Sequence, residues 1–139
     1  MQKIILDTNV LVSALIQRSY PFLIVSELFT RNDLELCVST ALMSEYYEVL
    51  KRRKFSKYPD FILRAETLLA DIERKATFFH LTVTLYIIND FADNRLLELA
   101  EESRADFLIT GNTNDFVIKT HKTTTIIEPR LYYENYYPR

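Results

Sequence analysis

The amino-acid sequence predicts an α/β fold built on a mostly parallel sheet, and two observations support this. Short apolar or β-branched runs alternate along the chain with stretches of helical periodicity. Proline, serine, threonine and asparagine residues typical of helix starts and turns stand between them. Because strands that alternate with helices form right-handed βαβ units, the strands are expected to run parallel. The length of 139 residues fits one domain with its own core, so we expect a single domain over residues 1–139.

The first half of the chain contains two predicted strands, each followed by helices. Residues 4–6 and 34–38 are apolar or nearly apolar runs, which favour buried strands. Pro21 favours a helix start, and Ser39 and Thr40 are favoured caps before the next helix. The predicted helices cover residues 10–16, 22–31, 41–53 and 60–73.

The second half begins with a segment that the sequence leaves open. Residues 76–88 are rich in β-branched and aromatic side chains, and they predict either one strand or two short extended pieces, 76–81 and 82–88. The polar stretch 89–94 then opens a helix over 95–103. Strands are expected over 105–110 and 123–127, and an aromatic helix or tail begins at about residue 129.

Composition and charge exclude several classes of protein. The net charge of −2 gives no overall field toward nucleic acid or anionic membrane, so any contact with a polyanion must be local. The one glycine, Gly111, rules out the glycine-rich phosphate loops of Walker and dinucleotide-binding proteins. The one cysteine, Cys37, lies in an apolar run and is expected to be a buried hydrophobe. With no leader or apolar run of membrane-spanning length, the sequence predicts a cytoplasmic protein with no membrane contact.

Acidic side chains follow the predicted strands. Asp7 ends the first strand, Glu45 lies just past the second, and Asp93 opens the helix before the strand at 105–110. Each has an ordinary explanation alone, which is helix capping for Asp7 and Asp93 and an exposed helix surface for Glu45. Together at one edge of a parallel sheet they would repel one another unless a cation lay among them. Such hard oxygen ligands suit Mg²⁺ or Mn²⁺.

In its ordered motifs the sequence resembles the PIN-domain family, in particular the small stand-alone VapC-like ribonucleases that are toxins of bacterial toxin–antitoxin pairs. The motifs are LDTNVLVSA at 6–14, SEYYEVL at 44–50, DNRLLELA at 93–100 and ADFLITGN at 105–112. The resemblance runs from residue 2 to about residue 128. It implies a three-layer α/β/α sandwich with a central, mostly parallel sheet of four or five strands, and a metal-dependent ribonuclease.

The resemblance also implies a quartet of acids. Asp7, Glu45 and Asp93 match the first three as catalytic residues and metal ligands, with Thr8 and Asn9 of the first motif in support. The fourth position departs from the family, because it carries Asn112 where an aspartate is common.

Asn112 could orient a water or offer a carbonyl oxygen, but it brings no charge. Asp115, one turn further on, is a possible substitute. The departure puts a second metal ion in doubt.

The predicted reaction is hydrolysis of an RNA phosphodiester bond by a metal-activated water. The alternative, which Asn112 keeps open, is a non-catalytic RNA- or protein-binding module with a degenerate acidic site. RNA is the expected partner. A cognate antitoxin and a homodimer stay open as further partners.

Three other features have two interpretations each. The basic cluster, defined as Lys51, Arg52, Arg53 and Lys54, could hold RNA phosphates or simply form a solvated helix end. His80 and His121 lack paired zinc-ligand spacing and are expected to be structural. The aromatic residues at 132–137 could stack bases, but packing on the protein's own domain or on a second subunit is favoured.

Overall fold

The computed structural model describes residues 1–113, 116 and 118–139 of the chain. Its strands are β1 (Gln2–Leu6), β2 (Leu34–Val38), β3 (Thr77–Phe78), β4 (Phe107–Ile109), β5 (Thr120–His121) and β6 (Thr124–Ile127). Its helices are α1 (Thr8–Ile16), α2 (Tyr20–Ser26), α3 (Thr40–Leu50), the 3₁₀ helix η1 (Arg53–Lys57), α4 (Phe61–Lys75), α5 (Phe91–Ser103) and α6 (Pro129–Asn135).

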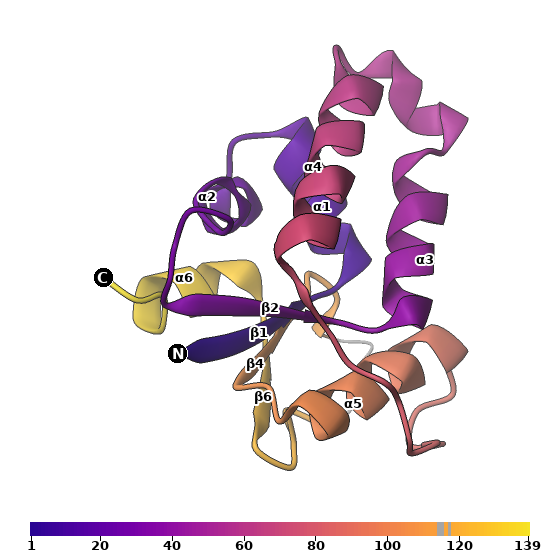
Figure 1. Ribbon diagram of the computed structural model, residues 1–139, viewed down its shortest axis with the longest axis vertical. Helices are drawn as coiled ribbons and strands as arrows, with labels where there is room; N and C mark the ends of the chain where they lie inside the picture. The colour runs from indigo at the N-terminus through magenta and orange to yellow at the C-terminus, as the bar shows by residue number, and fades with distance from the viewer. Residues whose placement is uncertain (114–115, 117) are drawn as a thin grey trace.

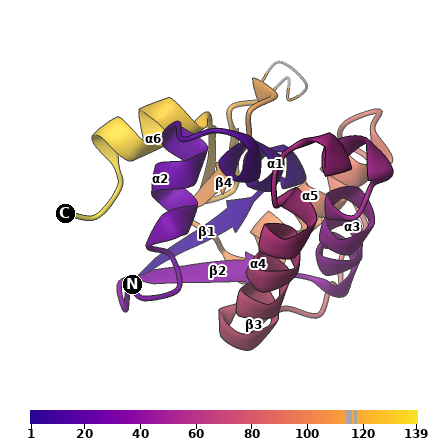
Figure 2. The same cartoon turned by 90° about the horizontal axis from the view of Figure 1, so that it is seen from above.

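The strands form one sheet in the order β3-β2-β1-β4-β6-β5. Neighbours are parallel except β5 and β6, which pair antiparallel. Helices α1 to α4 lie on one side of the sheet and α5 on the other (Figure 1). Seen from above, α3 and α4 lie side by side over that first face (Figure 2). This arrangement confirms the predicted three-layer α/β/α sandwich with a mostly parallel sheet.

The sheet has six strands instead of the expected four or five. The difference comes from its two edge strands, β3 and β5, which have two residues each. Strand β5 exists because the chain turns back at Lys122, whose φ of 55° lies in the left-handed region. No glycine or asparagine marks this turn in the sequence, so it could not be read there.

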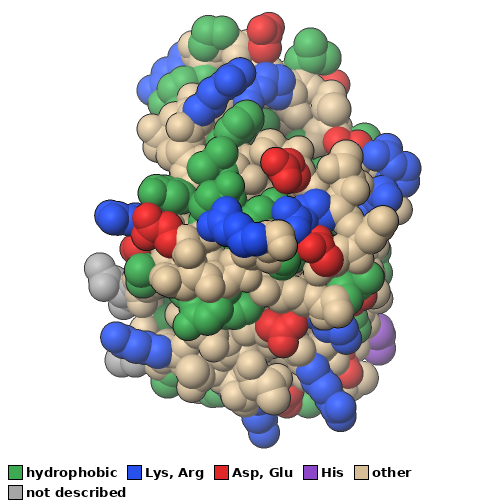
Figure 3. Space-filling model, turned by 90° about the vertical axis from the view of Figure 1, so that its left-hand side faces the viewer, with side chains coloured by type: hydrophobic (Ala, Val, Ile, Leu, Met, Phe, Trp, Pro, Cys, Tyr) green, Lys and Arg blue, Asp and Glu red, His purple; other side chains and the backbone are tan. Residues whose placement is uncertain are grey.

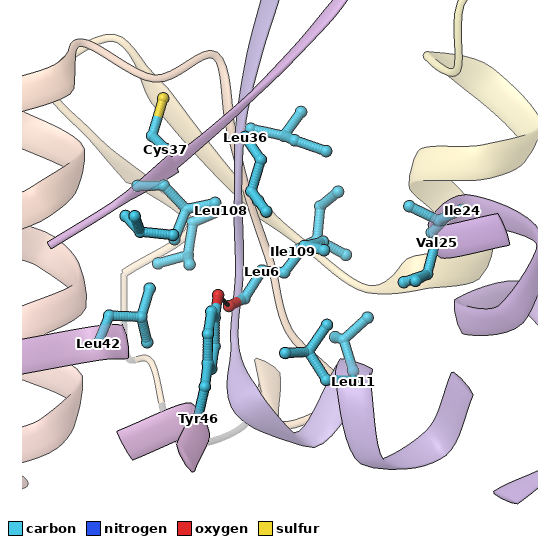
Figure 4. Close-up of a cluster of buried hydrophobic side chains, with 14 of the residues drawn as sticks. Leu6, Leu11, Ile24, Val25, Leu36, Cys37, Leu42, Tyr46, Leu108 and Ile109 are labelled. Carbon is cyan, nitrogen blue, oxygen red and sulfur yellow. Dashed lines mark hydrogen bonds between the residues drawn. The ribbon is translucent and has the colours of Figure 1, made fainter. Parts of the chain in front are cut away.

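The core lies where β1, β2 and β4 meet the first helices. Ile4, Ile5 and Leu6 of β1 are fully buried, as expected for a central parallel strand covered on both faces. Leu11 of α1 and Tyr46 of α3 reach toward Leu6 from the helical layer (Figure 4). The end of β1 is therefore held by packing from two helices.

Three predicted helix boundaries differ from the structure by three residues or more. Helix α2 ends at Ser26, and the N–H groups of Leu28 and Thr30 bond to carbonyls three residues back instead of continuing the helix to 31. Helix α3 ends at Leu50, before the basic cluster. Helix α5 begins at Phe91, four residues before the predicted start, because the Asp90 carboxylate caps it by accepting a hydrogen bond from Asp93 N–H at 3.0 Å.

After β3, residues 79–88 form no strand but a strap that runs along α5. Its backbone N–H groups donate to side chains of α5 at three places. Glu102 accepts from Thr82 (3.0 Å), Glu98 from Leu85 (2.8 Å), and Asn94 from both Ile87 (3.0 Å) and Ile88 (2.9 Å). Since the three acceptors are spaced by four residues, they share one face of the helix. The backbone donors of the strap thus bond to side chains of α5, where those of a strand would bond to the backbone of a neighbouring strand.

The C-terminal aromatic residues pack on the protein's own domain, as the sequence favoured. Tyr132 is fully buried and meets Phe107 of β4 at 5.2 Å between ring centroids. Arg31 lies 4.7 Å from the centroid of the Tyr137 ring. Within the described residues, no helix is both long enough and apolar enough to cross a membrane.

Candidate active site

Asp7 connects the end of β1 to both α1 and β4. Its Oδ1 accepts a hydrogen bond from Thr8 N–H at 2.7 Å, which caps α1. Its Oδ2 accepts from the Thr110 hydroxyl at 2.8 Å, just past the end of β4. Asp7 therefore does more than cap α1, because its second carboxylate oxygen is hydrogen-bonded at the carboxyl end of the neighbouring strand, β4.

Glu45 reaches the same edge from α3. The Thr8 hydroxyl donates to Glu45 Oε2, so Thr8 bridges the two acids by bonding Asp7 through its N–H and Glu45 through its side chain. Thr8 is buried, whereas Asp7 and Glu45 are half-buried. The structure thus brings the first two predicted acids together.

A buried tyrosine that sequence reasoning did not single out holds α3 in this position. The Tyr46 phenol donates to the Leu6 carbonyl at 2.5 Å, across the core (Figure 4). Complete burial raises the pKa of Tyr46 well above its ordinary value, and the charges of Asp7 and Glu45 raise it further. The phenol therefore stays protonated and remains a donor. Its position next to Glu45 in the sequence is the only sign of this role that the sequence offers.

Asp93 lies in the first turn of α5 and is half-buried. The capping explanation considered for it belongs instead to Asp90, as described above. The first turns of α3 and α5 lie close together at the carboxyl edge of β1 and β2 (Figure 1). Glu45 of α3 and Phe91, Ala92, Arg95 and Leu96 of α5 line one pocket there. Asp93 belongs to the helix turn that borders this pocket but is not one of its lining residues.

Two further side chains order this edge. Asn9 Oδ1 accepts from Gly111 N–H at 2.9 Å, and its amide nitrogen lies 3.3 Å from Asp7 Oδ2. Thr110 is fully buried, and its hydroxyl also accepts from Asn112 N–H at 3.1 Å. Thr110 was missed because a threonine at a strand end has no distinctive pattern.

The residue at the fourth acid position faces solvent. The Asn112 side chain is exposed. Asp115, the possible substitute, lies outside the described residues. At the fourth position the described chain therefore offers an exposed amide and no carboxylate.

The donor type fits a hard divalent cation, since carboxylate oxygens are the ligands that Mg²⁺ and Mn²⁺ prefer. Within residues 1–113, 116 and 118–139, however, no group of three or more Asp, Glu, His or Cys side chains is arranged to hold a metal ion.

The basic cluster lies at the far end of α3 and in η1, where all four side chains are exposed. Arg52 is paired with Glu48 at 2.7 Å, and Lys51 lies 5.3 Å from the centroid of the Tyr47 ring. By helix rise, Lys51 stands about 9 Å along α3 from Glu45. On the face that Figure 3 shows, basic and acidic side chains are interspersed without a large area of one sign.

Cys37 is the buried hydrophobe that the sequence predicted, and of the two histidines His121 is buried whereas His80 is exposed. Cys37 is buried, and burial raises the pKa of its thiol to about 12, so it remains an uncharged apolar group. His121 is buried and lies 3.1 Å from Glu101. In the described part of the chain, neither His80 nor His121 joins a group that could hold a metal.

These features define an α/β domain with an acidic site at the carboxyl edge of a parallel sheet. A family model described as "PIN domain" matches residues 3–114. The chain therefore belongs to the PIN-domain family, which confirms the resemblance found in its motifs.

A solved structure has the same fold. It is VapBC2 from Rickettsia felis bound to a DNA fragment from their promoter, with a TM-score of 0.58 and 16% sequence identity over 91% of this chain and 98% of that one. At this identity the likeness shows the fold alone. No curated protein sequence matches the chain.

Proposed function

We propose that the protein is a metal-dependent endoribonuclease that hydrolyses RNA phosphodiester bonds. The observation that carries this proposal is the Asp7–Thr8–Glu45 bridge, which joins an acid just past the end of β1 to an acid on α3. Asp93 would complete the set from the first turn of α5. Thr8 donates one hydrogen bond from its hydroxyl to Glu45 and another from its N–H to Asp7. Helix capping alone requires only the second of these. Membership of the PIN-domain family supports the same reaction.

Asp7, Glu45 and Asp93 would hold Mg²⁺ or Mn²⁺. When bound, the ion supplies a water of lowered pKa and stabilises negative charge on the phosphoryl oxygens. The protein's part is to fix the acids. Thr110 and Asn9 orient Asp7 Oδ2, and Thr8 orients Glu45 Oε2.

Because Asn112 brings no charge, we expect one metal ion to bind firmly and a second to bind weakly. The same residue supports the second candidate function, a non-catalytic module that binds RNA or protein through a degenerate site. The exposed Asn112 side chain and the lack of a ready three-ligand group among the described residues favour this alternative.

The biological role proposed here is that of a toxin in a toxin–antitoxin pair, acting in the cytoplasm. The motifs resemble stand-alone toxins of this kind, and the structurally similar VapBC2 is a complex bound to promoter DNA. The partners would be RNA, a cognate antitoxin and, as a further proposal, a second copy of the chain. The basic cluster would hold RNA phosphates, and residues 1–139 would act as one domain.

A cleavage assay separates the two candidate functions. Purified protein is incubated with RNA in Mn²⁺ or in EDTA, next to Asp7→Asn, Asp93→Asn and a matched control, Asp71→Asn, on α4. A nuclease is expected to cut only with Mn²⁺, with both site variants inactive and folded, and with Asp93→Asn as stable as the parent or slightly more so because carboxylate repulsion is relieved. Cutting that survives in either site variant, or in EDTA, would remove the proposed site. RNA binding without cutting would favour the binding module.

A further inference from the structure

A small pocket opens between the first turns of α3 and α5, next to the proposed active site. Its volume is about 120 Å³. Its walls are Ala41, Leu42 and Glu45 from α3 and Phe91, Ala92, Arg95 and Leu96 from α5. Because Glu45 belongs both to this pocket and to the acidic edge, a group bound in the pocket lies beside the site where RNA would be cut.

Phe91 and Arg95 form a stacked pair at the mouth of this pocket. The Arg95 guanidinium carbon lies 4.2 Å from the centroid of the Phe91 ring. The ring is nevertheless 70% exposed, although it is a large apolar group at the start of a helix. Exposed aromatic side chains next to a cavity are typical of surfaces that bind a partner or a ligand.

Arg95 is not fully explained by its contacts within the protein. It is paired with Glu98, whose side chain is 3% exposed. Its Nε is buried and has no hydrogen-bond partner in the part of the chain that the structure describes. A guanidinium placed this way keeps donor capacity that the fold itself does not use.

The charges of the pocket select the kind of ligand. Glu45 places a carboxylate on its wall, while Glu98 balances the charge of Arg95. A phosphate group would therefore be repelled. A neutral planar ring would not, and the remaining walls are alanine, leucine and phenylalanine.

We propose that this pocket binds a nucleobase of the RNA strand next to the bond that is cut. Phe91 stacks on the base, and Arg95 donates to an acceptor on its edge. Single-stranded RNA bases are commonly held by stacking on aromatic rings and arginine planes, with hydrogen bonds to their edges. Phe91 and Arg95 are then specificity residues that choose where the RNA is cut. This assignment rests on the proposed function only in taking RNA as the ligand.

A binding experiment without metal tests the pocket separately from catalysis. The protein in EDTA is titrated with 2′-O-methyl RNA trinucleotides, which resist cleavage, while its backbone amide NMR signals are followed. We expect shifts at Leu42, Ala92 and Leu96. Phe91→Ala should weaken binding about 5-fold or more, the size expected for the loss of one base–aromatic stack.

Two further variants make this experiment decisive. Ala41→Leu fills the pocket from its exposed α3 rim and should also weaken binding. Phe78→Ala removes another exposed phenylalanine ring, 49% exposed on β3 and outside the pocket, and should leave binding unchanged. If Ala41→Leu does not fold, Phe91→Ala compared with Phe78→Ala still decides, because both remove exposed rings.

The site of cleavage gives the second readout. Sequencing the products from a randomised RNA should show a base preference at one position beside the cut, and Phe91→Ala should lose it while still cutting. If the parent cuts nothing but binds trinucleotides through Phe91, the proposed function is wrong, whereas the binding of a nucleobase in this pocket stands and its role in choosing a cleavage site does not. Absence of trinucleotide binding, or equal binding by the parent, Phe91→Ala and Ala41→Leu, overturns the pocket assignment whatever the cleavage assay shows.

Discussion

Replacing Tyr46 with phenylalanine tests whether the phenol holds α3 against β1. The change removes one oxygen atom from a fully buried side chain and keeps the ring that fills the core. It deletes the 2.5 Å hydrogen bond to the Leu6 carbonyl at a place that water does not reach. Loss of one partner of a buried hydrogen bond costs about 1–3 kcal/mol, so we expect a decrease of that size in the free energy of unfolding.

Equilibrium unfolding in urea measures this loss as a lower midpoint with an unchanged slope. Tyr136→Phe is the matched control, because it makes the same change of one oxygen atom in a tyrosine that is half exposed. Its midpoint should stay close to that of the parent. A Tyr46→Phe midpoint as high as that of the control would refute the reasoning, since the phenol would then contribute nothing to joining α3 and β1. If Glu45 depends on this contact, the variant should also cut RNA more slowly.

Three other predictions concern the acids. Mn²⁺ at about 100 times its Kd should stabilise the parent by about 2.7 kcal/mol, because it binds only the folded state. Calorimetry should show this as a higher Tm, and Asp7→Asn should show little of the shift. An equal shift in both proteins would place the ion elsewhere. Asn112→Asp should tighten Mn²⁺ binding or raise the cleavage rate by adding a charged ligand, whereas Asp115→Ala should leave the metal-dependent rate almost unchanged; a fall in both quantities on Asn112→Asp would show that residue 112 is misplaced in this scheme. The hydrogen bonds from the Thr82 hydroxyl and backbone N–H lower the pKa of Glu102 from its ordinary 4.5. The stabilisation is present above pH 4.5 and is lost as pH falls through the lowered pKa. The protection of Thr82 N–H against hydrogen exchange, relative to its intrinsic rate at each pH, should therefore fall over that range in the parent, and an equal pH dependence in Glu102→Gln would contradict this.

The sequence predicted the parts of the fold that depend on local pattern. The bounds of β2, residues 34–38, are those of its apolar run, and Pro129 begins α6 as expected. The placement of Asp7 and Glu45 followed from topology, because parallel strands end at the same edge of a sheet. Thr8 links these two acids in the structure, whereas their joint action with Asp93 stays a prediction.

The parts that it could not predict depend on contacts between distant residues. Residues 79–88 have strand-like composition, yet α5 supplies side-chain acceptors that replace a neighbouring strand. Tyr46 and Thr110 acquire their roles from partners about 40 and 100 residues away in the chain, and no local pattern encodes such a partner. The ends of α2 and α3 were misjudged because tertiary packing overrides a continuing helical periodicity.

The strap also determines how the sheet ends. Edge strands expose unpaired N–H and C=O groups on which a second chain can extend the sheet, and proteins commonly keep them short to prevent it. Here β3 stops after two residues, because the chain then leaves the sheet and gives its donors to α5. The other edge, β5, is equally short. Each outermost strand therefore offers a second copy of the protein only two residues of backbone to pair with, which limits extension of the sheet from β3 and from β5.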